Sequence, residues 1–171
     1  QEQHQILERF IGHIKDKLEL RRQVAHLLTG VTIVFMIKIQ LLNAPMLFAI
    51  LIIGGVLSIL ARFRRIPILD RILLFLERPA DIKTFPGKGS FFLVLGSFLA
   101  LQFFQRDIAM AAIAIMAVGD AITTVVGTYF GKIKNPLNPK KHLEGTAIAI
   151  VVSTLSAFFF VPFPIAFFGS L

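Results

Sequence analysis

The stretch AVGDAITTVVGTYFGKIKNPLNPKKHLEGTAIAI, residues 117–150, decides the fold, because it places an acidic residue inside an apolar segment of membrane-spanning length. Asp120 has apolar residues before and after it, and a lysine-rich turn follows the segment. An ionised aspartate in the middle of a membrane helix costs about 2.5–3.5 kcal/mol, so it needs a cation or a water-filled cavity. The stretch therefore indicates a membrane helix that carries a functional carboxylate.

The composition of the whole chain supports a membrane class. Of its 171 residues, 56% are hydrophobic and 16% are charged, which is too apolar for an ordinary globular domain. The apolar residues form long blocks, each near the ~20 residues that a helix needs to cross a bilayer. Because backbone polar groups in lipid must bond to each other, these blocks predict helices. We expect an all-α polytopic membrane bundle that forms a single domain over residues 1–171.

Five membrane spans are predicted from the apolar blocks, at residues 24–42, 45–61, 89–104, 108–130 and 145–168. Two further segments, residues 1–20 and 66–78, have apolar residues along one helical face. Such segments either lie at the membrane surface or pack on the bundle. For residues 1–20 we expect an interfacial amphipathic helix.

The basic residues are distributed unevenly along the chain. The N-terminal segment and the loops 62–88 and 131–142 together carry 16 of the 18 lysines and arginines. With five spans, these three segments fall on one side of the membrane, which the positive-inside rule assigns to the cytoplasm. We therefore expect the functional loop on the cytoplasmic face of the cell membrane. The net charge of +8 then does not indicate a nucleic-acid partner.

The residues after Asp120 suggest phosphate chemistry. Four lysines lie within ten residues in the turn, and Glu144 opens the next apolar block. One or two carboxylates with phosphate oxygens and water suit Mg²⁺, and lysines neutralise phosphate charge. A structural interpretation is also open: glycines allow close helix packing, the lysines anchor the loop to lipid headgroups, and Glu144 favours a helix start.

The pattern GDAITTVVGTYFGK…NPKKHLEGT resembles the signature of the CTP-dependent lipid kinases, which act on dolichol, polyprenol, diacylglycerol or phytol. An upstream pattern carried by Glu19, Arg22 and His26 is similar to the opening of that family, as is the segment Phe85–Gly96. Three positions depart from the family pattern, namely Gln23, Thr123 and His142. The matching signature residues are Gly119, Asp120, Gly127, Gly131, Lys132, Lys140, Lys141, Glu144 and Gly145.

The resemblance implies an enzyme that transfers the γ-phosphate of CTP to a lipid hydroxyl, with Mg²⁺ held by Asp120 and Glu144. It implies that Asp120, Glu144 and Lys141 are catalytic. It also implies further spans beyond Leu171. The residues that the resemblance assigns to nucleotide binding are Arg22, His26, Gly119, Thr123, Gly127, Gly131, Lys132 and Lys140.

Two other functions remain open at this point. The segment NPKKHLEG, Asn138–Gly145, also resembles the signature of CDP-diacylglycerol synthases, which would transfer the cytidylyl group of CTP to a phospholipid phosphate. A non-catalytic channel, transporter or assembly subunit would instead use Asp120 for ion relay or helix pairing. The sequence does not decide the lipid acceptor or the oligomeric state, and a homodimer is among the alternatives.

Overall fold

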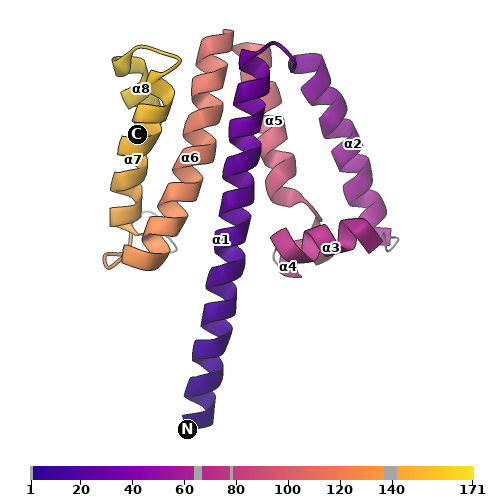
Figure 1. Cartoon of the computed structure of the whole chain (residues 1–171), viewed down its shortest axis with the longest axis vertical. Coiled ribbons are helices and arrows are strands. Elements are labelled where there is room, and N and C mark those ends of the chain that lie inside the picture. The colour runs from indigo at the N-terminus through magenta and orange to yellow at the C-terminus, as the bar shows by residue number, and fades with distance from the viewer. Residues whose placement is uncertain (1, 64–66, 78, 137–141) are drawn as a thin grey trace.

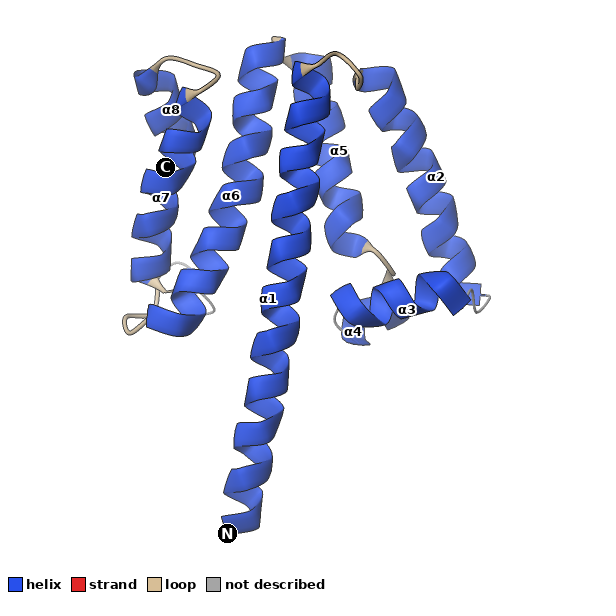
Figure 2. Cartoon of the chain, viewed as in Figure 1, coloured by secondary structure: helices blue, strands red, loops and turns tan. Residues whose placement is uncertain are grey.

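The computed structural model describes residues 2–63, 67–77, 79–136 and 142–171, and within these ranges the chain forms eight helices and no strand (Figure 2). This confirms the all-α prediction. The helices are α1 (Glu2–Lys38), α2 (Ala44–Phe63), α3 (Pro67–Leu76), α4 (Pro79–Thr84), α5 (Lys88–Phe103), α6 (Arg106–Phe130), α7 (Leu143–Phe158) and α8 (Phe163–Ser170).

The long helices run side by side, and α6 lies between α1 and α7 (Figure 1). Helix α5 packs between α6 and α2, while α3 lies crosswise at the end where α2 finishes (Figure 1). At the opposite end, the Arg106 guanidinium donates to the backbone carbonyls of Ile37 and Lys38, which closes the carboxyl end of α1. A cation at that end also opposes the partial negative charge of the helix dipole.

Three of the described helical segments are long and apolar enough to cross a membrane: Lys17–Lys38, Ala44–Phe63 and Arg106–Phe130. Helices α5 and α7 are apolar but shorter, with 16 residues each. At about 1.5 Å per residue they reach roughly 24 Å, less than the ~30 Å hydrocarbon thickness of a typical bilayer. The chain is therefore an all-α membrane protein in which two of the five predicted spans are short.

The segments that the charge pattern groups together lie at one end of the bundle. That end holds the amino end of α1, the carboxyl end of α6 and the helices α3 and α4 (Figure 1). The α1–α2 and α5–α6 connections lie at the other end (Figure 1). We call the first end the basic end, because the loops that meet there carry most of the lysines and arginines.

Two predicted boundaries are wrong. The predicted interfacial helix over residues 1–20 is not separate: from Glu2 onward the chain continues into the first span as α1, because neither proline nor glycine interrupts residues 13–29. The predicted span 145–168 is broken after Phe158, and α8 folds back against α7. Pro162 explains the break, since proline lacks a backbone N–H and disfavours a helical conformation in the residue before it.

Helix α6 packs on α1 and α7 at positions where at least one of the two helices has a glycine. A Cβ atom added to Gly30 of α1 would overlap the Cβ atom of Ala117, so the two backbones cross in close contact. On the α7 side, a Cβ on Gly145 would lie 2.5 Å from the carbonyl oxygen of Thr123 and 3.0 Å from the backbone nitrogen of Gly127. Close approach through small residues is a common way for membrane helices to associate.

We expect the substitution Gly145→Ala to destabilise the bundle by about 1–3 kcal/mol, because the new methyl group meets backbone atoms that cannot move aside. Thermal unfolding in detergent measures the effect. The control is Gly54→Ala in α2, where no atom lies within 4 Å of the added Cβ and the melting temperature should stay equal or rise slightly. Equal melting temperatures for both variants would contradict the close α6–α7 contact.

Candidate functional site

Asp120 lies on the side of α6 that faces α1. Its carboxylate is close enough to Arg22 and His26 to interact electrostatically with both. Thr124 and Thr128 follow at intervals of four residues on the same side of the helix. The sequence-predicted acid therefore has a partially buried arginine and histidine beside it, which is the kind of partner that an intramembrane carboxylate requires.

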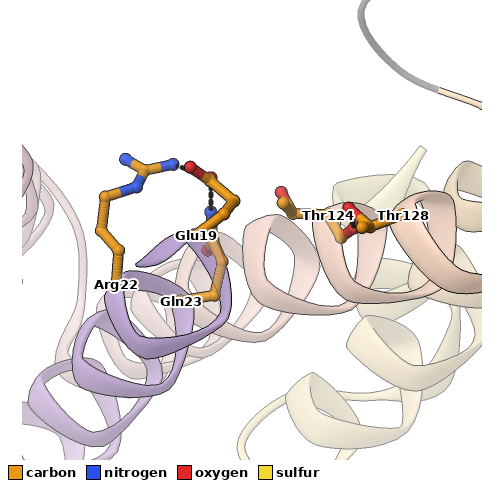
Figure 3. Close-up of polar contacts among 5 residues, drawn as sticks. All are labelled: Glu19, Arg22, Gln23, Thr124 and Thr128. Carbon is orange, nitrogen blue, oxygen red and sulfur yellow. Dashed lines mark hydrogen bonds and ion pairs between the residues drawn. The ribbon is translucent and has the colours of Figure 1, made fainter. Parts of the chain in front are cut away.

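Three polar residues of α1 form a hydrogen-bonded network in the candidate site (Figure 3). Arg22 forms an ion pair with Glu19, and the Gln23 side-chain nitrogen donates to the same carboxylate at 3.1 Å. Gln23 departs from the family pattern, yet it is fully buried and belongs to this network. The neighbouring Arg21 lies outside this network, since its guanidinium is over the ring of Phe75, 4.6 Å from the centroid.

Glu77 is a member of this cluster that sequence reasoning did not identify. It follows α3, is buried, and contributes to the electrostatic environment of Arg22. Its carboxylate also lies 3.8 Å from the position of a Cβ added to Gly89, near the start of α5. A glutamate in a basic loop is usually exposed to solvent, so the sequence alone does not identify Glu77 as a buried member of the cluster.

Two buried polar atoms of the cluster, Nε of Arg22 and Oε1 of Gln23, have no hydrogen-bond partner within the described ranges. Buried polar groups almost always bond to protein, water or a bound ligand. An arginine Nε–H is a good donor to a phosphate oxygen. The cluster around Asp120 can therefore accept an anionic ligand on the Arg22 side.

The predicted nucleotide-binding residues Gly119, Thr123 and Gly127 lie on another side of α6, which packs against α7. A Cβ on Gly119 would lie 3.1 Å from Oγ of Ser153. The Thr123 hydroxyl donates to the Gly119 carbonyl at 2.6 Å, and both Thr123 and Gly127 are buried. The three residues therefore take part in the contact between α6 and α7. This is the arrangement expected if the glycines allow close helix packing.

Gly131 and His142 form the base of the lysine-rich loop. A Cβ on Gly131 would overlap the His142 side chain, so the glycine makes room for the imidazole. The Leu143 N–H donates to the Ile133 carbonyl at 2.9 Å, and Lys134 pairs with His142 in an isolated antiparallel bridge. Lys132 and Lys134 are exposed, while Lys140 and Lys141 lie outside the described residues.

Glu144 bonds to the backbone of this loop. Its Oε1 accepts hydrogen bonds from the backbone nitrogens of Lys132 and Ile133, both at 3.1 Å, and Oε2 lies 3.3 Å from the Ile133 nitrogen. The pKa of the carboxyl is lowered by its own backbone N–H, by those of Lys132 and Ile133, and by the nearby His142. The backbone hydrogen bonds of the loop therefore favour the charged form of Glu144.

The two predicted metal ligands are not brought together. Asp120 lies about 15 Å along the axis of α6 from Phe130, at about 1.5 Å per residue. Its side chain also tilts toward the amino end of the helix, away from the loop that Glu144 contacts. Since Mg²⁺ binds oxygens at roughly 2.1 Å, both carboxylates cannot share one ion in this arrangement. Among the described residues, no group of three or more histidine, cysteine, aspartate or glutamate side chains could hold a metal.

Comparisons with known proteins find distant relatives. An uncharacterized protein of Methanocaldococcus jannaschii is 32% identical over 124 residues, which cover 67% of this chain and 62% of that protein. Phytol kinase 1, chloroplastic, of Arabidopsis thaliana is 39% identical over 61 residues, 34% of this chain and 20% of the kinase. CTP-dependent diacylglycerol kinase 1 of Eremothecium gossypii is 27% identical over 81 residues, 47% of this chain and 25% of the kinase.

The chain thus spans less than two thirds of the length of each of these relatives. No family model matches it. No solved structure matches it either. The comparisons therefore show partial, distant similarity to two lipid kinases.

We expect the backbone amide signals of Lys132 and Ile133 to report the titration of Glu144. Because its folded-state pKa is lowered from the ordinary 4.5, the charge of Glu144 strengthens the loop contacts above that value, and this contribution is lost as the pH falls through the lowered pKa. Amide chemical shifts recorded by NMR between pH 3 and 7 measure this midpoint. In Glu144→Gln the same signals should not titrate, and a wild-type midpoint above 4.5 would contradict the hydrogen-bonded geometry.

Proposed function

We propose that this protein is a membrane-embedded kinase that transfers the γ-phosphate of CTP to the hydroxyl of a lipid. The observation that carries the proposal is the position of Asp120, which lies against Arg22 and His26 inside an apolar bundle. The distant similarity to a phytol kinase and to a CTP-dependent diacylglycerol kinase supports the reaction class. A polyprenol, dolichol, phytol or diacylglycerol hydroxyl would be the acceptor.

Asp120 suits Mg²⁺ as a single carboxylate ligand, because this ion usually keeps several waters and takes its other ligands from substrate phosphates. When bound, the ion would neutralise charge on the phosphates of CTP. Glu144 does not suit the same ion, since its oxygens bond to the loop backbone. The protein itself would therefore supply one carboxylate to the metal.

The cations of the site would act on the phosphates. Arg22 has an unpartnered Nε within the described residues and would bond a phosphate oxygen. Lys132 would neutralise charge on the phosphate tail, and the same role is proposed for Lys140 and Lys141, which lie outside the described residues. These groups stabilise the charge that spreads over the transferring phosphoryl oxygens.

His26 would receive the lipid hydroxyl. As the hydroxyl oxygen attacks the γ-phosphorus, its proton would pass to the neutral imidazole, the bond from phosphorus to the β–γ bridging oxygen would break, and CDP would leave. The imidazole lies next to the Asp120 carboxylate, which stabilises the imidazolium that forms. The concentration of basic residues at one end of the bundle favours an active site on the cytoplasmic face of the cell membrane.

We expect purified protein to transfer label from γ-labelled CTP to a lipid alcohol in the presence of Mg²⁺. Asp120→Asn should lower the rate by at least about 100-fold, because the only carboxylate proposed for the metal is lost. The control is Asp107→Asn, which changes an exposed acid in the first turn of α6 at the opposite end and should retain activity.

Three outcomes would contradict the proposal. Unlabelled lipid together with a CDP-lipid and pyrophosphate would identify a cytidylyltransferase. Absence of nucleotide binding would favour a non-enzymatic membrane protein. Equal rates for Asp120→Asn and the wild-type protein would remove Asp120 from the reaction.

A further inference from the structure

We infer that Glu144 is the positioning residue of the lysine-rich loop, acting on the nucleotide through the backbone of Lys132 and Ile133 rather than as a metal ligand. This inference rests on the proposed function, because it concerns how that site binds its phosphates. Glu144 precedes the apolar part of α7 and lies outside the three candidate membrane spans.

The carboxylate holds two consecutive backbone N–H groups. Oε1 accepts from the nitrogens of Lys132 and Ile133 at 3.1 Å, and Oε2 lies 3.3 Å from the second nitrogen. Hydrogen bonds that involve an ionised group are roughly twice as strong as those between neutral groups. Glu144 therefore ties the first residues after α6 directly to the first turn of α7.

The chain on both sides of the loop is fixed at the same place. The Leu143 N–H donates to the Ile133 carbonyl at 2.9 Å, and the Lys134–His142 bridge lies next to it. Gly131 and Gly127 leave space for His142, which lies against both. With the register of the loop base fixed, the exposed Lys132 and Lys134 side chains leave the backbone at defined positions.

Glu144 bonds to backbone groups that follow the carboxyl end of α6, whereas Asp120 lies within that helix. Because the backbone at Lys132 and Ile133 is already fixed by these hydrogen bonds, less conformational entropy is lost when the exposed Lys132 side chain binds a phosphate. The glutamate should therefore affect nucleotide affinity more than the chemical step.

The kinetic test compares Glu144→Ala, Glu144→Gln and the control Asp107→Ala in the full chain, with CTP as the varied substrate. We expect Glu144→Ala to raise KM for CTP by about 10-fold or more while kcat changes by less than about 3-fold, because hydrogen bonds to a charged group are lost. Glu144→Gln keeps an oxygen acceptor for the same N–H groups and should stay within about 3-fold of wild type. Asp107→Ala should match wild type.

Equal, large losses of kcat in Glu144→Gln and Glu144→Ala, with a raised Mg²⁺ requirement, would overturn the inference, because a metal ligand needs the charge. A second readout is independent of activity: amide hydrogen exchange at Lys132 and Ile133. We expect protection in wild type and Glu144→Gln and its loss in Glu144→Ala. Unchanged exchange in Glu144→Ala would overturn the positioning role, whereas a wild-type protein without phosphotransfer but with this exchange pattern would overturn only the proposed function.

Discussion

The structure depends on close backbone contact along both sides of α6. Gly30 of α1 meets Ala117, and Gly145 of α7 meets the backbone of Thr123 and Gly127. Lipid is as apolar as most of these side chains, so packing of small residues, rather than burial from water, holds such helices together. The contact with α1 brings Arg22 and His26 to Asp120, and the contact with α7 places Glu144 beside the loop that follows α6.

A motif that is continuous in sequence is divided in space by the periodicity of α6. Residues 119, 123 and 127 follow the side of the helix that packs on α7, whereas Asp120 lies about 100° away on the side toward α1. The glycines of the motif thus build the scaffold, and the aspartate carries the charge. Adjacent residues of the motif therefore lie on different sides of α6 and make different contacts, which their spacing in the sequence does not reveal.

Much of the fold follows from hydropathy, because helices in lipid must satisfy their own backbone. The apolar pattern continues across Pro162 and so predicts one unbroken span, although the proline itself signals the break before α8. The structure places Asp120 near Arg22 and His26, while the roles that the family resemblance implies for these three residues stay predictions. Glu77 and the loop contacts of Glu144 were not predictable, because they depend on long-range packing that no local pattern encodes. The predicted roles of Lys140 and Lys141 lie outside the described residues and stay predictions.

The central claim is that Asp120 supplies the protein ligand of the metal–nucleotide complex. The most direct measurement is electron paramagnetic resonance of Mn²⁺, which prefers the same oxygen ligands as Mg²⁺, added to the purified protein with and without CTP. We expect a bound Mn²⁺ signal that forms only with CTP, is lost in Asp120→Asn, and persists in Glu144→Gln. A CTP-dependent signal of equal affinity in Asp120→Asn would contradict the claim.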